Sequence, residues 1–224
     1  GCTVLGVLIE AIAYKPLRGA SSLNVLITAI GVSYFLQNSA LLVFGADSKT
    51  FTSLVNIPSV SIMDGEVIIS GVTIASIVTC IIVMVVLSLF INKTKAGQAM
   101  LAVSEDTGAA TLMGISVNRT IAITFAIGSA LAGIAGVLLC SAYPTLSSQT
   151  GAMPGIKAFT AAVFGGIGSI PGAMIGGMVM GVVENLSKAY ISSQLSDAIV
   201  FALLIIILLV KPTGLMGKKI QEKV

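Results

Sequence analysis

The residue types that carry enzyme chemistry are scarce in this chain of 224 residues. It has no histidine, and its three cysteines, Cys2, Cys80 and Cys140, each lie in or beside an apolar run. Their wide spacing fits neither a metal site nor an obvious disulfide, and no two carboxylates within an apolar run offer acid and base roles. A nucleotide-binding loop needs a Ser or Thr after G-x-x-x-x-G-K, which Gly217-Lys218 lacks. We therefore expect no enzyme activity, no ATPase site, no metal and no bound cofactor.

One polar segment between the long apolar runs does have the pattern of a binding element. Ser104 suits the N-cap of a helix, and the acidic pair Glu105 and Asp106 places negative charge at the positive end of the helix dipole. Gly114 suits the left-handed residue that ends a helix. The pattern predicts a helix over Glu105–Met113.

This predicted helix carries a small apolar face. Ala109, Leu112 and Met113 fall on neighbouring positions, with acidic residues beside them. Such a face either docks into a groove on a cytoplasmic partner or lies on the protein's own bundle or on lipid. We interpret residues 92–119 as a cytoplasmic loop that docks a partner, with the interfacial helix as the alternative.

The elements that must position this loop are membrane helices. The chain is 56% hydrophobic and 9% charged, with a mean hydropathy of +1.06, whereas a soluble domain is about a quarter charged. Apolar runs at Leu23–Phe44, Val67–Ile91 and Ile121–Leu139 are long enough to cross a bilayer. The sequence predicts an all-α, polytopic transmembrane helix bundle that forms a single domain over residues 1–224.

Glycine and proline interrupt the apolar pattern of the C-terminal half, at Gly165, Gly166, Gly168 and Pro171. We expect broken or short helices there, over Ile156–Ile167, Gly172–Val183 and Ala198–Val210. At the other end, the apolar stretch Cys2–Ile12 is too short to cross about 30 Å of hydrocarbon. We therefore expect a fragment that lacks its N-terminal spans.

Basic residues predict the direction of the spans. One side collects Lys15, Arg18, Lys93, Lys95, Arg119, Lys211, Lys218, Lys219 and Lys223, and the other collects Lys49, Lys157 and Lys188. Because positive loops stay inside, we expect a multi-pass protein of the inner cell membrane with a cytoplasmic C-terminus. The stretch Gly45–Glu66, with Asp47, Asp64 and Glu66, is then an external loop that either meets an extracytoplasmic partner or only connects two spans.

Small and polar residues within the apolar runs indicate how helices pack. Two rows recur every four residues and predict close helix contacts: Gly128, Ala132 and Gly136, and Gly168, Gly172 and Gly176. The first span offers polar side chains that serve either a substrate pathway or hydrogen bonds between helices: Thr28, Ser33, Gln37 and Asn38. Glu184 and Lys188, four residues apart, predict an interfacial ion pair.

The loop of residues 92–119, called the docking segment from here on, resembles the ATPase-contacting loop of ABC importer permeases. In that loop an acidic residue is followed by an Ala pair and a Gly. The matching residues are Glu105, Asp106, Ala109, Ala110 and Gly114. The flanking GQAMLAVSED and LMGISVNR are similar to LivH-type permeases of branched-chain amino acid importers. So are AYKPLRG, LITAIGVSYFLQN, MPGIKAF, GGIGSIPGAMIGG and LLVKPTGLMG, and the resemblance covers nearly the whole chain.

The resemblance implies a permease subunit that moves branched-chain or related small amino acids inward by alternating access. It implies ATPase subunits that use ATP and contact the docking segment at Glu105 to Gly114, a second permease subunit, and an extracytoplasmic substrate-binding protein. Membrane lipid surrounds such a chain. No basic stripe with interleaved aromatics points to nucleic acid.

Two other functions share many of these features. An ion-coupled secondary amino acid transporter also uses broken helices, although the three central spans contain no ionisable residue for proton coupling. A permease for urea or short amides would share most of the motifs quoted above. The sequence alone leaves the transported molecule and the identity of the second permease open.

Overall fold

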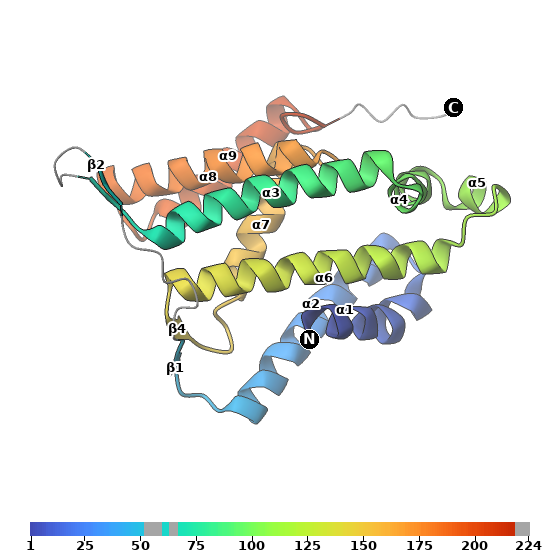
Figure 1. Cartoon of the computed structure of the whole chain (residues 1–224), viewed down its shortest axis with the longest axis horizontal. Coiled ribbons are helices and arrows are strands. Elements are labelled where there is room, and N and C mark those ends of the chain that lie inside the picture. Colours follow the sequence, from blue (N-terminus) through green and yellow to red (C-terminus); the bar gives the residue numbers. More distant parts are fainter. Residues whose placement is uncertain (52–59, 63–66, 218–224) are drawn as a thin grey trace. The chain divides into compact units, whose positions relative to one another are not determined.

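Helices dominate the residues that the computed structural model describes, which are 1–51, 60–62 and 67–217. The strands among them are two short antiparallel pairs (Figure 1). The predicted all-α class is therefore confirmed. Five charged residues used in the sequence predictions lie outside the described residues: Asp64, Glu66, Lys218, Lys219 and Lys223.

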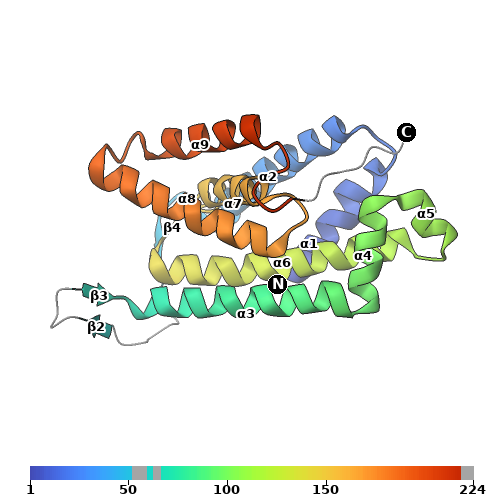
Figure 2. The same ribbon diagram turned by 90° about the horizontal axis from the view of Figure 1, so that it is seen from above.

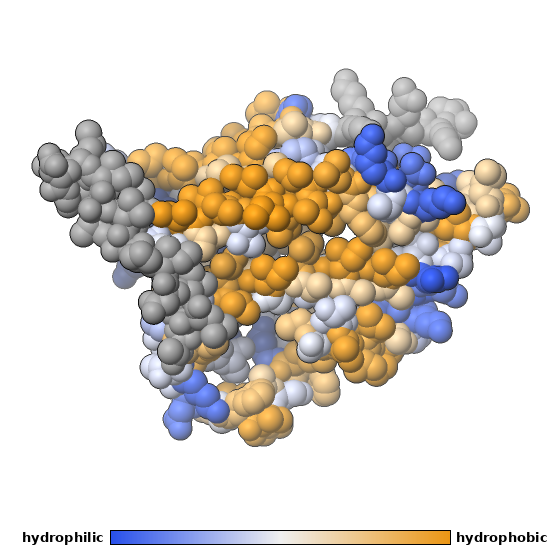
Figure 3. Space-filling model, viewed as in Figure 1, coloured by the Kyte–Doolittle hydropathy of each residue, from blue (hydrophilic) through white to orange (hydrophobic). Residues whose placement is uncertain are grey.

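Four described helices are long and apolar enough to cross a membrane. They are α2 (Ser22–Phe44), α3 (Gly71–Lys93), α6 (Val117–Ala142) and α8 (Ile170–Tyr190). The shorter α9 (Ser196–Val210) is also apolar. Apolar side chains cover the visible outer surfaces of these helices (Figure 3), as expected where a protein contacts lipid rather than water. The chain is thus a polytopic membrane protein.

Several helix boundaries differ from the sequence prediction, and two of these differences have a local physical cause. Residues Val67–Ile69 form β3, which pairs with β2 (Val60–Ile62), so α3 begins only at Gly71. A run of β-branched residues favours this extended pairing over a helix. At the other end of the chain, α8 runs on to Tyr190 and is longer than the predicted Gly172–Val183. An ion pair between residues four apart in its last turns supports this extension.

The described chain divides into two compact units. The first comprises Gly1–Thr79 and Leu89–Thr150, and the second comprises Cys80–Ser88 and Gly151–Val224. Helix α3 contributes its ends to the first unit and its middle to the second.

In the first unit, helix α1 (Cys2–Ile9) packs along α6 through small residues. A Cβ atom at Gly6 would lie 1.7 Å from Ser129 Oγ, and one at Gly133 would lie 3.2 Å from Cys2 Cβ. The contact at Gly6 has no room for a side chain, and the contact at Gly133 is tighter than usual for a Cβ atom. This close approach supplies the dispersion contacts that hold helices together in lipid.

After α1 the chain reaches α2 through two short helical turns. These are the π-helix η1 (Glu10–Tyr14) and the 3₁₀-helix η2 (Lys15–Leu17). The ring of Tyr14 lies 5.0 Å, centroid to centroid, from the ring of Phe125 on α6. At the far end of α2 the strand β1 (Lys49–Thr50) pairs with β4 (Thr145–Leu146), which follows α6.

The second unit is built on α7 (Ala152–Gly165), α8 and α9, and α9 folds back along α8 (Figure 2). Phe164, Met180 and Val200 contribute one buried side chain from each helix and form its core. Partly buried apolar residues, Ala161 and Val183 among them, pack around this core.

Glycines bring α7 and α8 into backbone contact. A Cβ atom at Gly176 would lie 2.5 Å from the Ala161 carbonyl oxygen, and one at Gly172 would lie 2.5 Å from the Gly165 carbonyl oxygen. Gly168 lies in the turn between the helices with a φ of +91°, so its backbone conformation explains its glycine. It makes no such packing contact, although the sequence places it in the same row.

The segment after α9 folds back onto the end of α7. The backbone N–H groups of Leu215 and Met216 donate to the carbonyl oxygens of Phe164 and Gly165, each at 2.9 Å. These bonds satisfy carbonyl groups that the end of a helix leaves without partners. The second unit is therefore closed at this end by backbone hydrogen bonds.

The close contact at Gly176 yields a prediction about stability. Replacing Gly176→Ala drives a Cβ atom into the α7 backbone and should cost about 1–3 kcal/mol, as overpacking does. The matched control is Gly181→Ala on the same helix, where a Cβ atom has open space. Thermal unfolding of the purified protein in detergent should show a lower Tm for the first variant only. Equal Tm values would contradict the close packing of α7 on α8.

Candidate functional site

The segment that resembles a docking loop consists of two helices rather than one. Helix α4 (Lys95–Glu105) follows α3, and α5 (Thr107–Leu112) follows α4. Asp106 separates them in an extended conformation, and its Oδ1 accepts hydrogen bonds from Gly108 N at 2.8 Å and Ala109 N at 3.0 Å. The N-cap of the docking helix is therefore Asp106.

This arrangement corrects the prediction of a helix over Glu105–Met113 capped by Ser104. The Ser104 hydroxyl instead donates to the Leu101 carbonyl oxygen within α4, at 2.7 Å, and Glu105 ends that helix. An Asp carboxylate that accepts two backbone N–H groups is a strong helix cap. The predicted left-handed end is confirmed, because Gly114 has a φ of +80°.

Helix α5 has one buried residue and an exposed apolar end. Ala110 is buried, and its carbonyl oxygen accepts a hydrogen bond from Ile115 N at 3.0 Å, just before α6 begins. Leu112 is 90% exposed and Met113 is 82% exposed. Ala109 is also exposed, as are Glu105 and Asp106. Figure 1 shows α5 beyond the N-terminal end of α6. The other helices of the first unit therefore leave Leu112 and Met113 uncovered.

The turn that leads into α4 is fixed at Gly97. Thr94 caps α4, because its Oγ1 accepts a hydrogen bond from Gly97 N at 3.0 Å. A Cβ atom at Gly97 would lie 2.4 Å from Ile91 Cα, so the chain turns tightly against the end of α3. The docking segment is thereby positioned by α3 on one side and by α6 on the other.

The polar residues predicted for a substrate pathway all make bonds within α2. The Thr28 hydroxyl donates to the Asn24 carbonyl oxygen at 2.8 Å, and the Asn38 amide donates to the Tyr34 carbonyl oxygen at 2.8 Å. Only Ser33 and Gln37 are brought together, with the Gln37 amide donating to Ser33 Oγ at 3.2 Å. Their role toward substrate stays a prediction.

The row Gly128, Ala132 and Gly136 lies beside the contact between α1 and α6 rather than in it. Gly128 and Gly136 have open space where a Cβ atom would stand. Ala132 and Gly136 line an apolar groove of about 460 Å³ in the first unit, together with Cys2, Leu5 and other residues of α1. Among the described residues, the tight contacts between α1 and α6 instead fall on Gly6 of α1 and Gly133 of α6.

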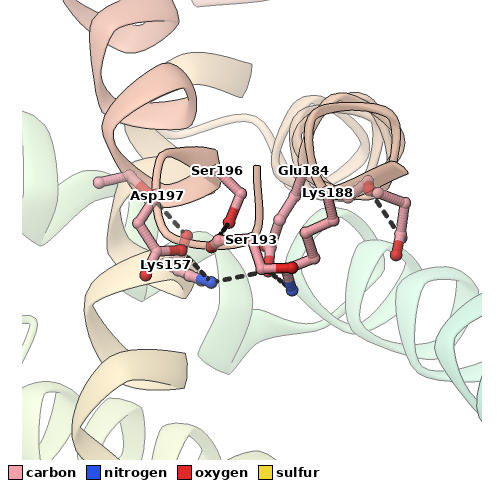
Figure 4. Close-up of polar contacts among 9 residues, drawn as sticks. Lys157, Glu184, Lys188, Ser193, Ser196 and Asp197 are labelled. Carbon is pink, nitrogen blue, oxygen red and sulfur yellow. Dashed lines mark hydrogen bonds and ion pairs between the residues drawn. The ribbon is translucent and has the colours of Figure 1, made fainter. Parts of the chain in front are cut away.

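An ion cluster joins the three helices of the second unit (Figure 4). Lys157 Nζ on α7 lies 2.8 Å from Glu184 Oε1 on α8 and 2.7 Å from Asp197 Oδ1 on α9. Lys188 Nζ lies 2.5 Å from the same Glu184 oxygen, which confirms the predicted pair. Two cations and two carboxylates thus meet where α7, α8 and α9 come together.

Sequence reasoning missed Lys157 and Asp197 as members of this cluster. It treated Lys157 only as a charge that reports the side of the membrane. A lysine inside an apolar helix is costly unless it is paired, so its position alone signals a partner. That partner lies 27 residues away in the sequence, too far for helical spacing to reveal.

A second ion pair that the sequence did not reveal lies in the first unit. The carboxylate of Glu10 contacts the guanidinium of Arg18, and Glu10 is only 3% exposed. Glu10 opens the π-helix η1, and Arg18 follows η2, so the pair spans the turns that join α1 to α2. Neither pair resembles a metal site, and no group of three or more potential metal ligands occurs within the described ranges.

Comparison with known proteins places the chain among transport permeases. Residues 2–208 match the family described as "Branched-chain amino acid transport system / permease component". The chain is 46% identical to the high-affinity branched-chain amino acid transport system permease protein LivH of Escherichia coli K12, over 96% of this chain and 71% of that protein. It is 44% identical to BraD, of the same description, from Pseudomonas aeruginosa, over 99% of this chain and 73% of BraD.

A more distant relative is the autoinducer 2 import system permease protein LsrD of Escherichia coli SMS-3-5, which is 29% identical over 90% of this chain and 63% of its own length. No solved structure matches the chain. The family match and the close relatives agree with the apolar, membrane-length helices. The chain therefore belongs to the family of permease components of branched-chain amino acid transport systems.

Proposed function

We propose that this chain is the translocation subunit of an ABC importer and moves branched-chain or related small amino acids inward by alternating access. The family match over residues 2–208 is the observation that carries this proposal. The two relatives at 44% and 46% identity, both named as branched-chain amino acid permeases, support the substrate class.

The energy for transport comes from separate ATPase subunits, and this chain binds no nucleotide or other cofactor itself. Their docking point is α5, with its acidic cap at Asp106 and its exposed side chains Leu112 and Met113. Amphipathic helices present such apolar anchors to grooves on their partners. The other components are a second permease subunit and an extracytoplasmic substrate-binding protein.

The local structure suits α5 for transmitting movement. Ala110 is buried, and the hydrogen bond from Ile115 N to Ala110 O fixes the short connection between α5 and α6, which begins at Val117. Because α6 is a membrane-length helix, a force applied to α5 is delivered directly to a span. Closure of the ATPases on ATP would thus bias the helices between outward-facing and inward-facing packings.

The direction of insertion follows from the basic residues. Lys93, Lys95 and Arg119 flank the docking segment and are exposed, and Figure 3 shows hydrophilic residues gathered at the α4 end of the first unit. Positive residues are retained in the cytoplasm. The docking segment and the C-terminus therefore face the cytoplasm, where the ATPases hydrolyse ATP.

A gentle detergent purification of the full-length protein from its native membrane, followed by mass spectrometry, tests this assignment. Recovery of an ATPase subunit and a second permease, together with ATP-dependent leucine uptake after reconstitution, is the expected result. Uptake driven by an ion gradient without ATP would instead indicate a secondary transporter.

The left-handed residue at the end of α5 gives a first test of the docking role. Gly114→Val places a β-branched side chain at a φ of +80°, which such residues rarely adopt. We expect normal membrane insertion but loss of ATP-driven uptake, measured with labelled leucine in proteoliposomes. Gly181→Val, in a helix with open space around it, is the control. Normal uptake by the first variant would refute docking through α5.

The exposed apolar pair gives a second test. Replacing both Leu112→Ala and Met113→Ala should leave the fold intact, because these side chains make little contact within the chain. Truncating an interface anchor costs about 1–3 kcal/mol, so the amount of ATPase recovered with the permease should fall about ten-fold or more. Leu42→Ala, equally exposed on α2, should leave recovery unchanged. An unchanged yield for the double variant would show that the ATPase docks elsewhere.

A further inference from the structure

The ion cluster of the second unit presents charges of both signs that are partly open to solvent. It contains Lys157, Lys188, Glu184 and Asp197, so its formal charges cancel. Their side chains are between 18% and 44% exposed. Figure 4 shows Lys157 between the two carboxylates. A molecule that carries one positive and one negative charge therefore finds a partner for each here.

Lys157, Glu184 and Asp197 form the ion pairs between helices, and an apolar residue lies one helical turn from each of them. Ala161 follows Lys157 on α7, Met180 precedes Glu184 on α8, and Val200 follows Asp197 on α9. Residues three or four apart share one face of a helix, and these three belong to the core of the unit or pack against it. The unit thus places charged side chains beside an apolar region. These two parts complement the charged groups and the side chain of an aliphatic α-amino acid.

Exchange of partners would solve the main energetic problem of moving a zwitterion through a membrane. A charge that leaves water must keep an opposite charge beside it, because an unpaired charge in the interior is strongly destabilising. If the ammonium group of the amino acid replaces Lys157 at one carboxylate, and the carboxylate of the amino acid pairs with Lys157, every charged group keeps an oppositely charged partner. No group is left unpaired during the step.

The other polar groups considered for a pathway suit this role less well. The pair Glu10 and Arg18 also has both signs, but Glu10 is buried. The side chains of Thr28 and Asn38 bond to the backbone of their own helix. In the part of the chain that the structure describes, the cluster is thus where exposed charges of both signs converge from three helices.

We propose that Lys157, Glu184 and Asp197 form a transient binding site for the ammonium and carboxylate groups of the transported amino acid. The site deepens the importer function proposed above and rests on it. The core beside it is closed in this structure, with Phe164 and Val200 buried, so α7, α8 and α9 part at the cluster to admit the aliphatic side chain. The opposite end of the unit stays closed through the backbone bonds of Leu215 and Met216.

Uncoupling of ATP hydrolysis from uptake tests the proposal. The complete complex, with its ATPases, second permease and binding protein, is reconstituted with Lys157→Met, Lys157→Arg or the control Lys49→Met. We expect Lys157→Met to lower leucine uptake about ten-fold while ATP hydrolysis stimulated by the binding protein stays within about two-fold of wild type. Lys157→Arg keeps the charge and should restore most of the uptake, and Lys49→Met should behave as wild type.

Two outcomes for Lys157→Met would overturn the proposal. Uptake and hydrolysis that both stay near wild type would show that the cluster does not contact substrate. Uptake and hydrolysis that fall together would assign it a purely structural role. The importer function itself is tested separately by the wild-type complex. If that complex shows no ATP-driven uptake, the proposed importer function is wrong.

A measurement on the unmodified complex covers the case in which the variant does not assemble. An amine-acylating reagent is applied with or without leucine, and modification of Lys157 is followed by mass spectrometry. Bound leucine should slow this modification about three-fold or more, because occupancy removes the free site from reaction. The analogue 4-methylpentanoate, which lacks the ammonium group, should protect less. Equal rates with and without leucine would overturn the proposal.

Discussion

Polar groups that leave water for a membrane must find their partners within the protein, and this constraint governs the whole chain. It explains why side chains such as Thr28 and Asn38 bond to their own helix. It also explains why the charges of Glu10 and Lys157 are each paired with a residue from another element. Apolar side chains face lipid at no cost, so helices are held together by close contact at glycines such as Gly6 and Gly176 instead.

The docking segment obeys different rules because its polar groups are exposed. Here an Asp cap, a left-handed glycine and a buried alanine are enough to fix a short helix against the start of α6. Leu112 and Met113 remain uncovered, although exposed apolar side chains are unfavourable in water. A partner that covers them removes this penalty. In the importer proposed above, the chain would receive its energy at this one small surface and use it in the membrane helices.

Much of the architecture could be predicted from the sequence, because long apolar runs and turn residues are local signals. The spans α2 and α6, the left-handed Gly114 and the pair of Glu184 with Lys188 all follow from patterns within a few residues. The break at Asp106 was missed because Ser104 and Asp106 are both good caps, and only the geometry decides between them. The partners of Lys157 and Glu10 were missed because they depend on which helices meet in space.

We propose that a separate ATPase drives this permease through α5. The most direct test places a photoreactive amino acid at position 112 of the full-length protein in its native membrane and identifies the products of cross-linking by mass spectrometry. We expect a cross-link to an ATPase subunit, and this cross-link should be lost when Gly114→Val distorts the end of α5. Cross-links to lipid or to the chain's own helices alone would show that the ATPase does not dock on α5.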